Sequence, residues 1–140
     1  MSRSRALVAF ALALGVLAVS GCVGEQRQDD ALARDDVILH AIATLDGVDS
    51  SDVEFDNSFG NGSRYEGDVV VAPDADARCV LVQTLGLLQQ GRPGVALSSV
   101  TVIQGATALT VDDLTPEQQS SLRATAASPG GAPVVPGCLP

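Results

Sequence analysis

The chain has few side chains that could carry out acid–base or nucleophilic chemistry. His40 is its only histidine, there is no lysine, and no serine stands in a G-x-S-x-G motif. A serine hydrolase needs a base beside its nucleophile, and only His40 could serve as one. This residue falls to one side of the apolar stripe of its segment, where a surface or boundary histidine is expected. We therefore expect no enzyme and no catalytic residue.

The first 21 residues have the layout of a secretory signal. Arg3 and Arg5 give a basic start, an apolar core follows over 6–19, and polar residues begin soon after Cys22. A membrane-spanning helix needs about 20 apolar residues, so this core is too short to remain as a spanning anchor. We expect cleavage before Cys22 and export of the rest of the chain.

The four residues Val19, Ser20, Gly21 and Cys22 resemble the lipobox of bacterial lipoproteins, and this resemblance covers only the leader. In that family the cysteine is joined by a thioether to diacylglycerol and becomes the first mature residue. Two or more acyl chains, such as palmitate, anchor stably because each buried methylene adds about 0.8 kcal/mol. The resemblance implies that Cys22 holds the protein on the outer face of the bacterial cell membrane. An ordinary signal peptide with a chance cysteine is the alternative.

Charge and aromatic content exclude several kinds of ligand. The net charge is −9, and all 17 acidic residues follow the leader. This negative field repels phosphate backbones and anionic headgroups, so we expect no nucleic acid and no membrane docking through a basic patch. The only aromatic residues after the leader are Phe55, Phe59 and Tyr65, which disfavours sugar binding and predicts an aliphatic core.

Two further cysteines, Cys79 and Cys138, lie in the exported part. An even pair in an exported protein is most simply a disulfide, worth about 4 kcal/mol at this spacing in the chain-entropy account. Residues 128–140 are rich in proline and glycine, so the bridge would hold this tail on the domain. A redox-active pair is the alternative, although the CxxC spacing is absent.

The exported chain is predicted to be one small domain with two irregular ends. Residues 22–34 are polar and are expected to form a flexible tether spanning about 20 Å. Residues 35–127 would form a single α+β domain, and residues 128–140 the tail.

Alternating apolar and polar residues predict three strands. The runs 52–56 and 65–71 are separated by the turn sequence "NSFGNGSR" and should form an antiparallel hairpin. A third strand is expected over about 95–103. Together these segments predict a three-stranded, mainly antiparallel sheet.

Three helices complete the expected order. The first begins near Asp35, where apolar residues fall at helical spacing. The second follows a cap at Asp74 or Asp76, and Gly86 within it costs some stability. A short last helix is indicated by Thr115, followed by a proline and then a glutamine at the capping-box position. The order is helix, strand, strand, helix, strand, with two helices on one face of the sheet and a C-terminal helix.

This order and two local motifs resemble the BON domain, a small envelope-associated module, over about residues 35–104. The motifs are "YEGDV" at 65–69 and "PGV" at 93–95. The loop "SFGNGS" is longer than that family's glycine turn, and the second helix lacks its alanine-rich pattern. The resemblance implies envelope or lipid association without catalysis. A generic three-stranded sheet with two helices on one face explains the same residues.

Three segments are similar to binding motifs but lack residues that those motifs need. Residues 52–56 start like a calcium loop, yet Asn57 and Ser63 stand where glycine and glutamate are required. "GRPG" at 91–94 is similar to an RNA-binding loop. "GNG" at 60–62 is similar to the start of a phosphate loop, but no third glycine and no lysine follow at the required spacing. We therefore expect no metal, no cofactor and no nucleic acid.

Two classes of function remain. The first is a non-enzymatic lipoprotein whose acidic domain binds a protein with a basic surface or assembles in the envelope, with an association that salt weakens. The second is capture of a small molecule or metal ion by the acidic residues around Asp46, Asp49 and Asp52, in which case divalent cations would raise the melting temperature. An envelope hydrolase that uses His40 is the remaining alternative.

Overall fold

The computed structural model describes residues 22–58, 60, 62–124 and 132–138, without the side chains of 22–29, 123 and 124. The predicted leader, residues 1–21, lies outside the described residues. The chain divides into two compact units, Met1–Leu32 and Ala33–Pro140. Helix α1 (Cys22–Ala43) supplies the described residues of the first unit and continues into the second.

Helix α1 corrects the expectation of a flexible tether. Residues 22–34 are helical, so the helix begins at Cys22 and not near Asp35. After Gly24 this segment holds only glutamate, glutamine, aspartate, arginine, alanine and leucine. Most of these residues favour the helix, and neither glycine nor proline interrupts them. The segment has no apolar stripe, so the periodicity of its sequence does not predict the helix.

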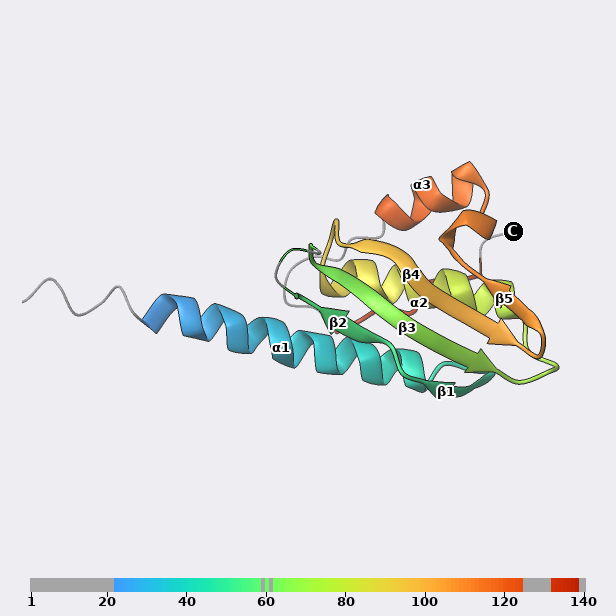
Figure 1. The fold of residues 1–140 in the computed structure, drawn as a ribbon, viewed down its shortest axis with the longest axis horizontal. Coiled ribbons are helices and arrows are strands. Elements are labelled where there is room, and N and C mark those ends of the chain that lie inside the picture. Colours follow the sequence, from blue (N-terminus) through green and yellow to red (C-terminus); the bar gives the residue numbers. More distant parts are fainter. Residues whose placement is uncertain (1–21, 59, 61, 125–131, 139–140) are drawn as a thin grey trace, which may run out of the picture. The chain divides into compact units, whose positions relative to one another are not determined.

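The second unit is an α+β domain, as the sequence predicts (Figure 1). Its five strands form one sheet in the order β1-β3-β4-β5, with β2 also pairing with β3. The strands are β1 (Val48–Ser51), β2 (Glu54–Asp56), β3 (Arg64–Val71), β4 (Ala96–Gln104) and β5 (Thr107–Leu109). The other helices are α2 (Ala77–Gly91), the 3-10 helix η1 (Val111–Asp113) and α3 (Pro116–Ala124).

The predicted hairpin is present, and the sheet has more strands than the three that the sequence predicts. β2 and β3 pair in antiparallel fashion, with Phe55 opposite Tyr65. β3 and β4 pair in parallel. Helix α2, which lies between them in the sequence, returns the chain to the end of the sheet where β3 begins, so β4 runs in the same direction as β3. A tight turn at Gly105, whose φ is 57°, then adds β5 as a further antiparallel strand. Over the described residues the sheet is mixed and five-stranded, with three of its four pairings antiparallel.

β1 and β2 are two pieces of one edge that separate where the chain crosses Gly67. The backbone N–H of Asp52 donates to the Asp68 carbonyl at 3.0 Å, and the Asp68 N–H donates to Asp52 Oδ1 at 2.5 Å. Gly67 has a φ of 127°, and a Cβ there would lie 2.7 Å from the Asp52 carbonyl oxygen and 2.8 Å from Val53 Cα. The glycine of "YEGDV" therefore allows two backbone segments to touch.

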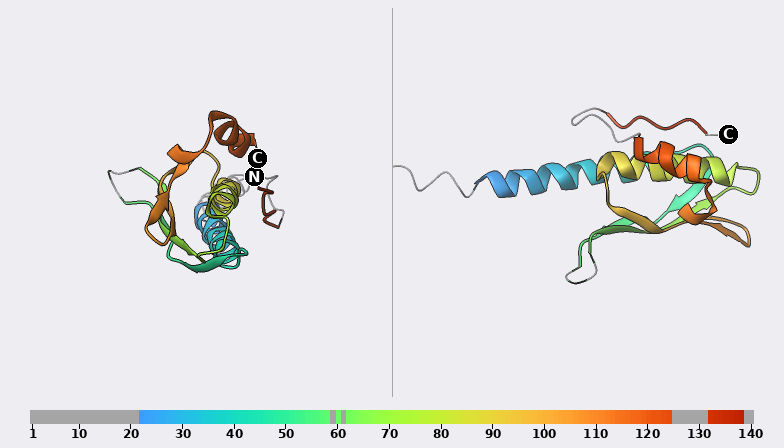
Figure 2. Two further views of the ribbon diagram at one scale, coloured as in Figure 1. Left: turned by 90° about the vertical axis from the view of Figure 1, so that its right-hand side faces the viewer. Right: turned by 90° about the horizontal axis from the view of Figure 1, so that it is seen from above.

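One face of the sheet carries α2 and the part of α1 that follows Leu32 (Figure 2). The core between these layers is aliphatic, as predicted, and among the described residues Tyr65 is its only aromatic side chain buried below 2% exposure. Helix α2 is covered on nearly every side. Its buried residues include Val80, Leu81, Val82, Leu85, Leu87 and Leu88.

Two predicted helix caps are present, and of the two candidates Asp74 and Asp76 it is Asp76 that caps α2. The N–H of Cys79 donates to Asp76 Oδ1 at 3.0 Å and so caps α2. At α3 the Gln118 N–H donates to Thr115 Oγ1 at 3.2 Å, and the Thr115 N–H donates to Gln118 Oε1 at 3.0 Å. This reciprocal pair is a capping box.

Candidate functional site

The face of the sheet that points away from α2 carries most of the strand charges. Along β3, the side chains of residues 65, 69 and 71 are buried on the helix side, whereas those of residues 64, 66, 68 and 70 point the other way. In Figure 1 the strands lie in front of α2, and no described helix crosses them on the near side. We call this surface the open face. Its polar residues are Glu54, Asp56, Arg64, Glu66, Asp68, Ser99 and Thr101.

Arg64 is the only cation among these residues, and it already forms ion pairs with two neighbouring carboxylates. Its Nη2 lies 3.0 Å from Asp56 Oδ2, and its Nε lies 2.7 Å from Glu66 Oε2. The hydrogen bond that Arg64 donates to Glu66 is the main cause of the raised pKa of Arg64. The pKa of Asp56 is lowered, first by the Ser58 hydroxyl, then by the Ser58 N–H, and also by Arg64. Arg64 and Asp56 therefore stay charged at neutral pH.

Glu54 and Asp68 leave the open face with an excess of negative charge. Glu54 stands directly opposite Glu66 in the β2–β3 ladder. Within the described part of the chain, neither the Glu54 nor the Asp68 carboxylate forms an ion pair. Like charges that face each other across a ladder repel, and a cation from outside would relieve that repulsion.

A second charged group is buried between α1, β3 and the end of α2. Asp35 is 5% exposed, and its Oδ2 accepts from Arg92 Nε at 2.9 Å and from Nη2 at 2.6 Å. Its Oδ1 accepts from the Tyr65 hydroxyl at 2.8 Å. The Arg92 guanidinium carbon also lies 3.7 Å from the centre of the Phe55 ring, which packs edge-to-face on Tyr65.

This buried group positions secondary structure, because both carboxylate oxygens of Asp35 are already engaged. Burial, and then the hydrogen bond to Asp35, raise the pKa of Tyr65. The hydrogen bond to Asp35 likewise raises the pKa of Arg92. The sequence does not predict this group, because local patterns place Asp35 in the first turn of a helix and Arg92 in a loop, and neither pattern pairs the two.

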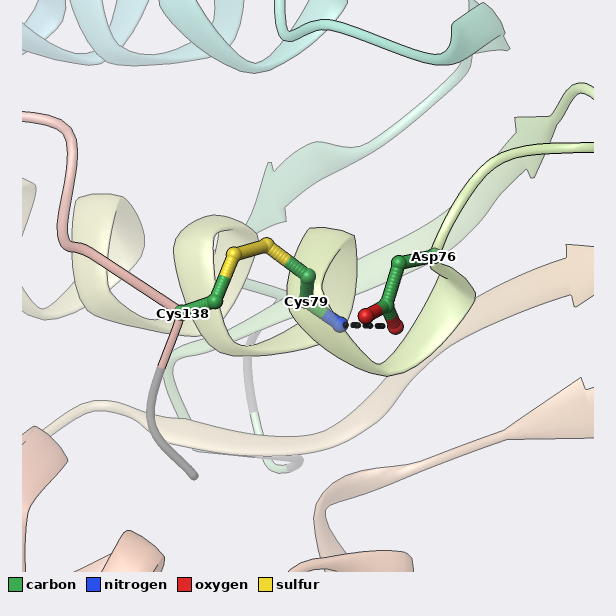
Figure 3. Close-up of a disulfide and its surroundings, with 3 residues drawn as sticks. All are labelled: Asp76, Cys79 and Cys138. Carbon is green, nitrogen blue, oxygen red and sulfur yellow. Dashed lines mark hydrogen bonds between the residues drawn. A yellow bond between two sulfur atoms is a disulfide. The ribbon is translucent and has the colours of Figure 1, made fainter.

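The C-terminal strap, residues 132–138, lies along α2. The side chain of Gln90 donates to the Val134 carbonyl at 2.6 Å and accepts from the Val134 N–H at 2.8 Å, much as a neighbouring strand would. A disulfide joins Cys138 to Cys79 with the Cα atoms 4.8 Å apart. Figure 3 shows the bridge leaving α2 in its first turn, beside the Asp76 cap.

The other residues singled out in the sequence are scattered. His40 is exposed on α1, and Asp46, Asp49 and Asp52 are exposed around β1. Of these carboxylates, the one at Asp52 accepts from a backbone N–H. Among the described residues, no three His, Cys, Asp or Glu side chains are grouped so that they could hold a metal ion.

The two glycine motifs form turns, and the proposed anchor residue begins a helix. Gly94 of "GRPG" has a φ of 82° and precedes β4, whereas Gly60 and Gly62 belong to the loop before β3. Cys22 is the first residue of α1. Across the described segments, no helix is both long and apolar enough to cross a membrane. The lipid on Cys22 stays a prediction.

Comparison with known proteins adds no assignment. No family model matches the chain, and no curated protein sequence matches it. The resemblances to the lipobox and to the BON domain therefore rest on the residues that carry them.

Proposed function

We propose that this chain is a lipid-anchored envelope protein whose acidic domain binds a partner protein with a basic surface and catalyses no reaction. The leader supports the first half of the proposal. Arg3, Arg5, an apolar core and the Val19–Cys22 motif together make Cys22 the acceptor of a lipid, and the exported domain would then stand on the outer face of the cell membrane.

The open face carries the second half of the proposal. A sheet surface that bears Glu54, Glu66 and Asp68, with Arg64 already paired, presents a patch of negative charge to the solvent. Lysine and arginine side chains of a partner would neutralise this patch. The serine and threonine hydroxyls of β4 beside it could accept and donate further hydrogen bonds.

Such a patch affects the rate of association more than the final affinity. Charges at the rim of an interface steer the approach of the partner, and salt screens that steering over a Debye length of about 8 Å at physiological ionic strength. Association with the partner should therefore be fast at low salt and should slow markedly as salt is added.

The partner and the anchor can be sought in one experiment. The chain would be crosslinked in its own cells, and both the captured proteins and the Cys22 peptide would be identified by mass spectrometry. Diacylglycerol on Cys22 together with one abundant partner supports the proposal. A chain secreted without lipid contradicts the anchor, and a lipidated chain that captures no protein contradicts the binding function.

Charge variants with a matched control then test the open face. The double variant Glu54→Gln/Asp68→Asn removes two unpaired carboxylates and leaves the Arg64 ion pairs intact. We expect its association with the captured partner to slow by about tenfold at low salt. The control Asp36→Asn/Glu117→Gln removes the same charge from exposed positions on α1 and α3. Equal effects of the two variants would assign the attraction to net charge and not to the open face.

A further inference from the structure

Strand β4 has a neighbour along its whole length on one edge only. β3 pairs with it from Ala96 to Ile103, whereas β5 pairs only with 102–104. Within the residues that the structure describes, no strand pairs with the second edge of β4 over 96–101, because the chain leaves β5 at Leu109 and turns into η1 and α3. An open edge of this kind is a template for another strand.

A groove of about 420 Å³ lies between this edge and the elements that follow β5. We call it the β4 groove. One of its walls is made by five consecutive residues, Gly94–Ser98. Consecutive side chains of an extended segment point to opposite sides, so backbone groups form part of this wall. The other wall comes from η1 and α3, with Val111, Asp112, Gln119 and Leu122.

The β4 groove has apolar residues at its base and one exposed carboxylate, that of Asp112, at its side. Leu97 and Leu122 are buried beneath the groove, and Val111 is half-buried beside them. Gln119 is occupied, since its amide donates to the carbonyls of Val111 and Leu114 at 3.0 and 3.2 Å. Asp112 is exposed, and its carboxylate forms no ion pair within the described residues.

We propose that the β4 groove binds an extended segment of a partner protein as an added strand. The segment would pair its backbone with the open edge of β4, seat one apolar side chain over Leu97 and Leu122, and place a lysine or arginine beside Asp112. Backbone pairing provides affinity in this mode of recognition, and the side-chain positions provide specificity.

Two observations favour this occupant. Backbone N–H and C=O groups in a row match another polypeptide backbone and have no counterpart in an acyl chain. A second copy of the exported chain, in which 17 acidic residues outnumber the arginines, would bring more negative charge to a groove whose one charged residue among the described lining is Asp112, so a basic segment of another protein fits better. The β4 groove and the open face are lined by different residues, and the inference does not rest on the proposed function.

The first test uses the purified exported chain, labelled with nitrogen-15, and the capped peptide Lys-Val-Thr-Val-Lys as the probe. We expect saturable amide shifts over 96–101 and in η1, with a dissociation constant on the order of 0.1–1 mM. Two N-methylated versions of the peptide separate edge pairing from general stickiness. A strand uses alternate residues on each edge, so methylation of one alternate set should abolish the shifts and methylation of the other should not.

Variants locate the contact. Asp112→Asn should weaken binding of the probe by about fivefold, which corresponds to about 1 kcal/mol. The control Asp36→Asn and the open-face variant Glu54→Gln/Asp68→Asn should bind it like the parent chain. The inference is overturned by equal binding of both methylated peptides, by shifts confined to other parts of the chain, or by a dimer that already occupies the β4 edge before peptide is added.

Discussion

The ring of Pro136 lies where the side chain of any residue other than glycine would begin at position 86. A Cβ placed on Gly86 would collide with Pro136 Cγ and would lie 3.5 Å from Leu122 Cδ2. Glycine in the middle of α2 costs about 1 kcal/mol relative to alanine. The structure explains why the helix contains it, because Gly86 makes room for the C-terminal strap.

Gly86→Ala should therefore lower stability although alanine is the better helix former. We expect a loss of about 1–3 kcal/mol, as for other overpacked sites, measured by urea unfolding. In a Pro136→Ala background the collision is relieved, so the same substitution should have little effect or should stabilise. Additive effects of the two substitutions would show that the strap and the helix do not meet at this point.

The disulfide should stabilise the domain through the loop that it closes. Cys79 and Cys138 are 59 residues apart, and the chain-entropy account gives about 4 kcal/mol for a loop of this length. We expect the double variant Cys79→Ala/Cys138→Ala to lose up to that amount in urea unfolding. A reducing agent should lower the stability of the parent chain and leave the double variant unchanged. A parent chain insensitive to reduction would mean that the bridge adds no stability.

Tyr65 offers a direct probe of the buried charged group, because it is the only tyrosine and there is no tryptophan. Its pKa is raised, first by burial and then by the hydrogen bond to Asp35. In the unfolded chain the phenol loses its proton near pH 10, so above about pH 10 the folded state holds more protons than the unfolded state. Stability should therefore fall as the pH rises above that value.

The ultraviolet absorbance of tyrosinate measures this directly. At about pH 11 the denatured chain should show tyrosinate and the folded chain should not. Tyr65→Phe should remove this part of the alkaline loss of stability, at a cost of about 1.5–3 kcal/mol near neutral pH for the lost hydrogen bond to the Asp35 carboxylate. Titration of the folded chain near pH 10 would mean that the phenol is open to solvent.

The ion pair of Asp35 with Arg92 should be worth more than the ion pairs of the open face. Removing one partner of a buried pair leaves an uncompensated charge, which costs about 3–5 kcal/mol. Arg92 is 25% exposed and Asp35 7% exposed as side chains, so we expect Arg92→Ala to lose about 3 kcal/mol. Arg64→Ala is the matched control, and it should lose about 1 kcal/mol or less because its side chain and that of Glu66 are both about one-third exposed.

Local patterns predicted the local structure of this chain. The caps at Asp76 and Thr115 depend on residues within one helical turn, and the β2–β3 hairpin depends on alternation around one loop. The parallel pairing of β3 with β4 depends on how α2 packs, which no short window reports. The first half of α1 also escaped detection, because helix propensity without an apolar stripe gives no periodic signal.

The contacts of the buried charged group and of the C-terminal strap could not be predicted from the sequence. Asp35 meets Arg92 across 57 residues of sequence and Tyr65 across 30. Gln90 likewise meets the strap across 44 residues. Nothing in the types of these residues distinguishes them from their neighbours. The cysteine pair was the one long-range contact that residue type alone could suggest, because the chemistry of an exported thiol pair is restrictive.

Gly67 provides the sharpest test of the fold, because its role combines a dihedral angle with a contact. Gly67 and Gly105 both have positive φ, at 127° and 57°. A Cβ at Gly105 would meet nothing within 4 Å, so Gly105→Ala should cost about 1–2 kcal/mol for the left-handed conformation alone.

At Gly67 the added carbon would also press on the backbone of Asp52 and Val53, which cannot rotate away as a side chain can. The strand must then shift, which would strain both hydrogen bonds between Asp52 and Asp68. The same shift would disturb the packing of the buried Val53 side chain. We expect Gly67→Ala to lose more than about 4 kcal/mol in urea unfolding, at the upper end for single substitutions. Equal losses at the two glycines would show that β1 and β2 can move off β3 without cost, and that the break between them has no structural role.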